Sequence, residues 1–94
     1  MSVYRITRFA ASDMDKLAEA VESIRSELES LGADSIDIVS YGNGKGVTLA
    51  KYPDQATMDA AAAGANKAFG KMIELGIIDA DSIHPHAGEV IKSF

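Results

Sequence analysis

The chain has 94 residues, 47% of them hydrophobic, and a formal net charge of −5 at neutral pH. This length suits one domain with a modest core, so we predict a single domain over residues 1–94. The negative charge argues against a nucleic acid partner, and the absence of cysteine excludes disulfides and is typical of a cytoplasmic protein. We see no signal peptide and no apolar run long enough for a membrane span, so no membrane partner is expected.

The first predicted element is a strand from Val3 to Phe9, in which side chains alternate between two faces. Ile6 is the only aliphatic residue in the middle of this strand, so we expect it to face the helices. This choice turns Arg5 and Thr7 toward the opposite face.

A helix is predicted from an N-cap at Ser12 to about Leu31, followed by Gly32 at the position that commonly ends a helix. Its apolar residues recur at steps of three and four, which is typical of an amphipathic helix. This apolar stripe consists of Met14, Leu17, Ala18, Val21, Ile24, Leu28 and Leu31.

Residues Ser35 to Tyr52 are predicted to form a hairpin around a type I′ turn at Asn43-Gly44. This turn pairs Gly42 with Lys45 and, counting outward, Ile38 with Leu49. The aliphatic face, expected to pack on helices, contains Ile36, Ile38, Ser40, Val47, Leu49 and Lys51. The mixed face, where we expect function, contains Asp37, Val39, Tyr41, Gly46, Thr48, Ala50 and Tyr52. A slip of one residue in the turn would exchange the two faces.

A second helix is predicted to begin at a cap on Asp54 and to end at Gly76. It is rich in alanine and contains Gly64, so it either packs closely on its neighbours or borders a ligand cavity. Residues 79–83 are expected to form one helical turn, and Glu89 to Phe94 to form the last strand.

The order strand, helix, strand, strand, helix, strand predicts an α+β, ferredoxin-like βαββαβ fold. Its antiparallel four-stranded sheet carries two helices on one face. The other face would expose an apolar patch, and pairing two sheets about a two-fold axis would cover it. We therefore predict a homodimer in the form of a dimeric α+β barrel.

The chain resembles the dimeric α+β barrel superfamily, which includes the antibiotic-biosynthesis-monooxygenase-like (ABM-like) and stress-responsive barrel domains. The resemblance covers the whole element order, and its local focus is the segment from Lys51 to Ala61. The family pattern there is an aromatic residue, matched by Tyr52, then an aspartate, matched by Asp54. An alanine-containing helix start follows, matched by Ala56 and Asp59-Ala60. Members with the monooxygenase-like signature usually place a histidine where this chain has Ala61, so the resemblance implies the fold more than a chemistry.

We expect six residues to bind a ligand inside the barrel: Arg5, Thr7, Val39, Tyr41, Tyr52 and His84. The Arg5 guanidinium can hold a carboxylate or enolate in a fork, or it can pair with Asp37 or Glu89. The two tyrosines either stack on a ligand or pack at the dimer interface.

His84 and His86 are the candidate catalytic residues, because a histidine at the cavity mouth can act as a general base near neutral pH. The alternative is that both lie on a surface loop. Two histidines without a third ligand do not make a metal site, and we predict no metal and no other cofactor. The turn from Gly42 to Gly46 leads into a strand and lacks the spacing of a phosphate-binding loop.

Two functions follow from these residues. The first is a ligand-binding barrel protein whose cavity holds a small apolar molecule with an acidic or polar head. The alternative is a cofactor-independent monooxygenase-like enzyme acting on an aromatic or polyketide-like substrate. The sequence decides neither whether the protein is an enzyme nor which ligand it takes. RNA recognition by this strand order is disfavoured by the charge and by the absence of its aromatic signature.

Overall fold

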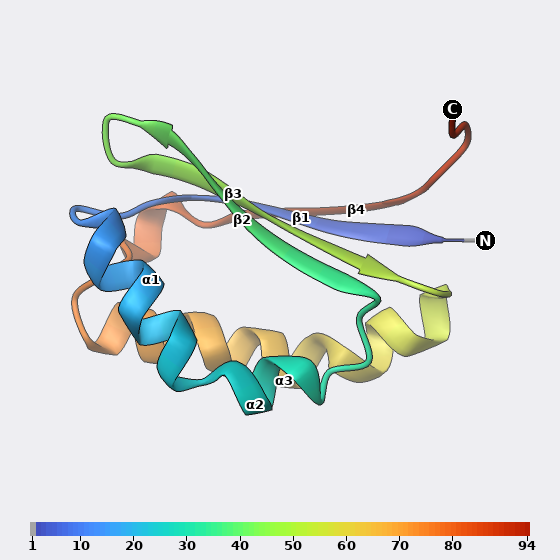
Figure 1. The fold of residues 1–94 in the computed structure, drawn as a ribbon, viewed down its shortest axis with the longest axis horizontal. Coiled ribbons are helices and arrows are strands. Elements are labelled where there is room, and N and C mark those ends of the chain that lie inside the picture. Colours follow the sequence, from blue (N-terminus) through green and yellow to red (C-terminus); the bar gives the residue numbers. More distant parts are fainter. Residues whose placement is uncertain (1) are drawn as a thin grey trace.

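The computed structural model describes residues 2–94 and consists of two layers, a four-stranded sheet with the helices on one of its faces (Figure 1). The strand order is β2-β3-β1-β4, and all neighbouring strands are antiparallel. This arrangement confirms the predicted ferredoxin-like fold. The elements in chain order are β1 (Val3–Ala10), α1 (Met14–Ser23), α2 (Arg25–Glu29), β2 (Ser35–Gly42), β3 (Lys45–Tyr52), α3 (Gln55–Glu74), the 3-10 helix η1 (Ala80–Ser82) and β4 (His84–Glu89).

The β2–β3 hairpin contains a β-bulge that the sequence prediction missed. Gly42 pairs with Lys45 as predicted, and Asn43 in the turn has a φ of 54°. The register then shifts between Ser40 and Gly42, so that Ile38 lies opposite Thr48 and not opposite Leu49. A bulge adds one residue to one strand, and side chains alternate with a period of two. The predicted faces of β3 are therefore exchanged relative to β2.

This register also decides which face of β1 the helices cover. Arg5 pairs with Ala50, and Thr7 pairs with Thr48, and such pairs share one face of a sheet. The helix-covered face thus includes Val3, Arg5, Thr7, Phe9, Ile36, Ile38, Gly46, Thr48, Ala50 and Tyr52. The open face includes Tyr4, Ile6, Arg8, Asp37, Val39, Val47, Leu49, Lys51, His84 and His86.

The prediction that Ile6 faces the helices is wrong, because it depended on one aliphatic residue and not on the pairing with β3.

Gly46 belongs to the helix-covered face, where a Cβ atom would lie 2.7 Å from the Val39 carbonyl oxygen and 2.9 Å from Phe9 Cζ. The missing side chain therefore allows the Phe9 ring to lie against β3.

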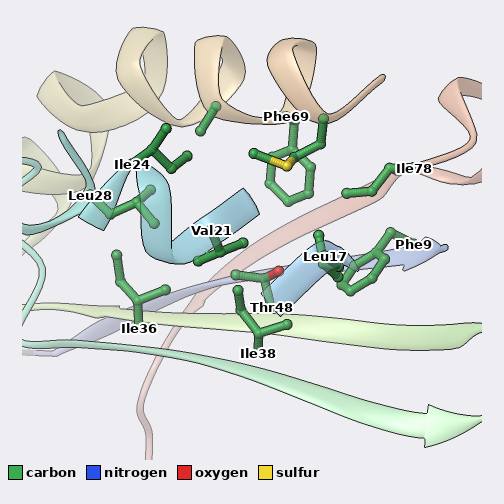
Figure 2. A pocket seen from close by; sticks show the side chains of 12 residues that line it. Phe9, Leu17, Val21, Ile24, Leu28, Ile36, Ile38, Thr48, Phe69 and Ile78 are labelled. Atoms are coloured by element: carbon green, nitrogen blue, oxygen red, sulfur yellow. The ribbon is translucent and has the colours of Figure 1, made fainter. Parts of the chain in front are cut away.

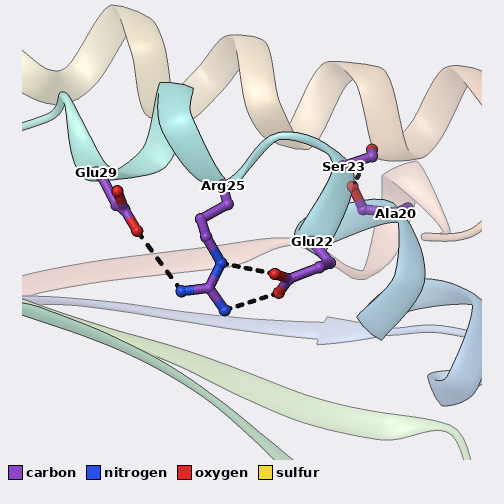
Figure 3. A network of polar contacts seen from close by, with 5 residues as sticks. All are labelled: Ala20, Glu22, Ser23, Arg25 and Glu29. Atoms are coloured by element: carbon purple, nitrogen blue, oxygen red, sulfur yellow. Dashed lines mark hydrogen bonds and ion pairs between the residues drawn. The ribbon is translucent and has the colours of Figure 1, made fainter.

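The predicted first helix is divided at Ile24 into α1 and α2, and its N-cap is Asp13 rather than Ser12. The Asp13 carboxylate accepts hydrogen bonds from the amides of Asp15 and Lys16 at 3.0 and 3.1 Å. Near the break, the Ser23 hydroxyl donates to the Ala20 carbonyl at 2.6 Å (Figure 3). Such a bond competes with the helical hydrogen bonds and often bends a helix.

The helix α3 agrees with its predicted ends. The Asp54 carboxylate accepts hydrogen bonds from the Thr57 amide and hydroxyl, both at 2.7 Å, and Gly76 has a φ of 73°. These two hydrogen bonds hold the pKa of Asp54 below its ordinary value, and the bond from the amide has the larger effect. At Gly64, an added Cβ atom would overlap Leu31 Cδ2, which supports the close packing predicted for this helix.

The last strand, β4, is displaced from its predicted position. It spans His84–Glu89 and pairs with β1, in which Val3 lies opposite Glu89. Beyond this pair the Val90 amide donates to the Ser2 carbonyl at 2.9 Å. The predicted strand runs from Glu89 to Phe94. Because β1 begins at Val3, most of that segment has no neighbouring strand with which to pair. The short helical turn predicted over residues 79–83 is present as η1.

The core between sheet and helices forms two separate clusters of buried residues. One lies toward the end of β1 and the start of α1 and comprises Phe9, Ala11, Leu17, Ile24, Met72 and Ile78. The other lies at the opposite end of the sheet and comprises Val3, Ala50, Tyr52, Met58 and Ala61.

Candidate functional site: an interior cavity with a charged end

An apolar cavity of about 50 Å³ lies between the helix-covered face and the helices (Figure 2). Thr48 provides the only polar side chain in its wall. The lining residues are Phe9, Leu17, Val21, Ile24, Leu28, Ile36, Ile38, Thr48, Ala68, Phe69, Met72 and Ile78. We refer to this space as the apolar chamber.

A second cavity of about 50 Å³ adjoins the apolar chamber. Both spaces share the lining residues Leu28, Ile36, Thr48, Ala68 and Phe69. The second space adds Arg5, Thr7 and Tyr52, together with Leu31, Ala50 and Ala65. We refer to it as the polar chamber and to the two chambers together as the interior cavity. Apolar atoms form nearly all of the wall in both chambers, and the second chamber is bordered in addition by the side chains of Arg5, Thr7 and Tyr52, while Thr48 borders both chambers.

Arg5 is held in the polar chamber by α3. Its Nη2 donates a hydrogen bond to Asn66 Oδ1 at 3.2 Å. Its Nε is buried and has no hydrogen-bond partner within residues 2–94. A buried donor without an acceptor costs about 1–3 kcal/mol, and such a group requires an explanation. An acceptor atom on a bound molecule would satisfy this Nε.

The two hydroxyl-bearing residues beside Arg5 are well buried, since Tyr52 is 1% exposed and Thr7 is 3% exposed. Burial raises the pKa of Tyr52 above its ordinary value of 10.0, and the positive charge of Arg5 lowers it by a smaller amount. The Tyr52 hydroxyl therefore keeps its proton at neutral pH and can donate a hydrogen bond.

An outer groove of about 290 Å³ runs between the α1–α2 segment and the edge strand β2. It shares Val21, Leu28, Ile36 and Ile38 with the apolar chamber, so these four side chains separate the cavity from solvent. The groove therefore adjoins the apolar chamber from outside.

Four charged residues line the outer groove, and three of them, Glu22, Arg25 and Glu29, connect α1 to α2 (Figure 3). Arg25 Nε lies 2.7 Å from Glu22 Oε1, and its Nη1 lies 3.5 Å from Glu29 Oε1. The hydrogen bond from Arg25 lowers the pKa of Glu22. All three side chains are largely exposed, and exposed ion pairs contribute little stability. These ion pairs therefore add little to the stability of the α1–α2 segment.

The structure brings together only three of the six residues predicted to bind a ligand. Arg5, Thr7 and Tyr52 line the polar chamber. The other three, Val39, Tyr41 and His84, lie on the far side of the sheet or at its hairpin end. The prediction that Arg5, Thr7, Val39, Tyr41 and Tyr52 share the face away from the helices is wrong. The bulge at Tyr41 reverses the alternation between β2 and β3, so Arg5, Thr7 and Tyr52 lie under the helices and Val39 lies on the open face.

The two candidate catalytic histidines, His84 and His86, pair with Arg8 and Ile6 on the open face. They are therefore separated from the interior cavity by the sheet. Between residues 2 and 94, no group of three or more His, Cys, Asp or Glu side chains is arranged to hold a metal ion. No helix in the same range is long and apolar enough to cross a membrane.

Sequence reasoning missed Asn66 and the cavity-lining role of Leu28, Ile36 and Phe69. The three apolar residues carry no distinguishing signal, because their spacing is that of any core residue. Asn66 does carry one, since it is the one uncharged polar residue between Ala60 and Ala68. An amide that stands alone on an alanine-rich helix indicates a polar partner within its reach, even though Asn66 itself is exposed.

No protein-family model matches the chain, and no curated protein sequence matches it. Solved structures do match. SnoaB, a cofactor-independent oxygenase from Streptomyces nogalater, superimposes with a TM-score of 0.76 and 10% identity, over 98% of this chain and 95% of that one. A dimeric ferredoxin-like protein from Jannaschia sp. CCS1 has a TM-score of 0.70 and 20% identity, over 96% of this chain and all of that one.

A second dimeric ferredoxin-like protein, from an uncultured marine organism, has a TM-score of 0.72 and 18% identity, over 99% of this chain and 98% of that one. At such identities the likeness establishes the fold alone. The chain therefore has the ferredoxin-like fold that the sequence indicated.

Burial raises the pKa of Tyr52 and Arg5 lowers it. This opposition gives a direct test of the polar chamber. Replacing Arg5 by Met removes the cation, so the pKa of Tyr52 should rise further above 10.0. The measurement is the absorbance of ionised tyrosine as a function of pH, in a background where Tyr4 and Tyr41 are replaced by Phe. An unchanged or lower pKa would show that Arg5 does not act on this hydroxyl.

Proposed function

We propose that the protein binds a small, mainly apolar molecule with an acidic or polar head in the interior cavity. The observation that carries this proposal is the buried Nε of Arg5, which has no partner within residues 2–94 at one end of an otherwise apolar space. A pocket with apolar walls and a few polar groups that fix orientation is the usual form of a small-molecule site.

The size of the cavity limits the ligand. Each chamber measures about 50 Å³, whereas an apolar cavity of about 150 Å³ is known to bind benzene. The two chambers joined together, with small side-chain movements, suit a single ring that carries a short polar substituent. A polycyclic molecule would require α1 and α2 to move away from β2.

The polar chamber suits a carboxylate or an enolate as the head group. Arg5 offers Nε to an acceptor, and its guanidinium is already held by Asn66. A donor that is positioned in advance loses less conformational freedom on binding. The hydroxyls of Thr7 and Tyr52 can supply further hydrogen bonds to the same head group.

We also infer that two copies of the chain pair through the open face. Val39, Val47, Ile6 and Leu49 lie in two adjacent rows across the middle of this face, and Val39 is 39% exposed. An apolar sheet face without helices is of the kind that marks an interface. Two structural neighbours are described as dimeric, which supports a homodimer here.

The second candidate function is a cofactor-independent oxygenase, and the fold likeness to SnoaB favours it. In this reaction Arg5 would stabilise an enolate formed from the substrate. Among the described residues that line the two chambers there is no histidine and no carboxylate. The base would therefore have to be Tyr52, whose raised pKa makes it a poor one at neutral pH, or the substrate itself.

Ligand binding is tested first with benzoate, a single ring with a carboxylate. Native mass spectrometry of freshly purified protein should also reveal any retained compound, which organic extraction would release. Arg5→Met should weaken benzoate binding by about tenfold or more, because charge-assisted hydrogen bonds contribute about 1.5–3 kcal/mol. Ala68→Leu should abolish binding, since Ala68 lines both chambers.

The matched control for this experiment is Ala63→Leu, which places the same side chain on an exposed position of α3 and should leave binding unchanged. If Arg5→Met and Ala68→Leu both bind benzoate as tightly as the unaltered protein, the interior cavity is not the binding site.

The oxygenase candidate predicts oxygen uptake when the protein is supplied with monocyclic quinols. The rate should fall strongly in Tyr52→Phe if Tyr52 transfers the proton, and in Arg5→Met if Arg5 holds the enolate. The replacement His84→Ala should leave the rate unchanged, because that side chain lies across the sheet from the cavity. Absence of uptake with every quinol in an oxygen electrode would reject this candidate.

The dimer is tested by Leu49→Asp, which places a charge in the apolar centre of the open face. Burying an unpaired carboxylate is costly, so this variant should sediment as a monomer at micromolar concentrations where the unaltered protein sediments as a dimer. Leu75→Asp serves as the control, because Leu75 is 57% exposed at the end of α3. A dimer in both variants would contradict the proposed interface.

A further inference from the structure

Another pocket, of about 220 Å³, lies at the hairpin end of the sheet and shares only Phe9 with the described lining of the apolar chamber. Its walls are formed by Arg8, Phe9, Ala10, Tyr41, Lys45, Gly46, Ser82 and His84. We refer to this space as the cationic pocket, and we propose that it binds a small phosphate monoester that carries a planar group. The proposal is independent of the function proposed for the interior cavity.

Three basic side chains from three different strands converge on the cationic pocket. Arg8 in β1 lies directly opposite His84 in β4, and Lys45 in β3 pairs with Ala10, two residues beyond Arg8. Residues that alternate in this way share one face of the sheet. The register of the sheet, and not chance surface proximity, therefore holds the three side chains together.

The cationic pocket contains no carboxylate among its described lining residues, although the chain carries a net charge of −5. The salt bridges found within residues 2–94 all involve Arg25, so neither Arg8 nor Lys45 has an acidic partner there. Asp79 approaches this region through its amide, which donates to the Ala10 carbonyl at 3.1 Å. Its carboxylate accepts a hydrogen bond from the Asp81 amide at 3.1 Å.

Tyr41 forms an aromatic wall of the cationic pocket and is 60% exposed. It is the residue that the β-bulge leaves without a cross-strand partner. Bulges occur preferentially next to functional sites, where they redirect a side chain. A ring of this kind offers its face to a planar group on the ligand.

The combination of Arg8 and Lys45 favours a phosphate monoester. A guanidinium offers a planar fork that matches phosphate oxygens, and a lysine adds a mobile point charge. The imidazole of His84 supplies a further donor at the same place. Two full positive charges without a carboxylate match the double negative charge that a phosphate monoester carries at neutral pH.

Phenyl phosphate is the probe for this site, and binding is followed through amide NMR shifts of the isotopically labelled protein. We expect saturable shifts at Gly46 and His84. Arg8→Gln and Lys45→Gln should each weaken binding by about tenfold, since each removes one charge-assisted contact. Lys16→Gln, which removes an exposed lysine on α1, should leave the affinity unchanged.

Tyr41→Ala separates the two parts of the proposal. It should weaken phenyl phosphate binding and leave the binding of inorganic phosphate unaltered. Three results would overturn the inference: no saturable shift with phenyl phosphate, equal loss of affinity in Lys16→Gln, or shifts confined to Leu28 and Phe69, which would locate the probe in the interior cavity.

Discussion

The pairing register of the β2–β3 hairpin is the constraint on which both sides of this molecule depend. The bulge at Tyr41 moves β2 by one residue relative to β3. As a result, Thr48, Ala50 and Tyr52 lie under the helices, and Val47 and Leu49 face outward. Because β1 pairs with β3 along its whole length, the same register places Arg5 inside. One extra residue near a turn thus determines the chemistry of the interior.

A second consequence concerns how the core is filled. The buried residues separate into two clusters, and members of both border the interior cavity. A small domain gains little from leaving such a space, because close packing provides much of its stability. The buried Nε of Arg5 adds to the cost. Both features have the same explanation if a ligand fills the space and accepts that hydrogen bond.

The two faces of the sheet have different roles. The helix-covered face borders the interior cavity, which suits an apolar ligand with one polar end. The open face combines an apolar centre with a basic corner at the hairpin end, where Arg8, Lys45 and His84 meet. The helices cover only the first of these faces (Figure 1), so the second is available for a copy of the chain and for an anion.

The sequence by itself determined the features that depend on neighbours in the chain. The element order, the cap at Asp54 and the end of α3 before Gly76 follow from local hydrogen bonding and backbone preferences. The positive φ at Asn43 follows in the same way from the requirements of a tight turn.

Only the tertiary structure decided which face of each strand is covered, and with it the site. The position of Arg5 depends on pairing with β3, and the position of its partner Asn66 depends on how α3 crosses the sheet. The limit of β4 at Glu89 is likewise set by where β1 begins. These contacts join residues far apart in the chain, and a period of two allows either face to be buried until the register is known.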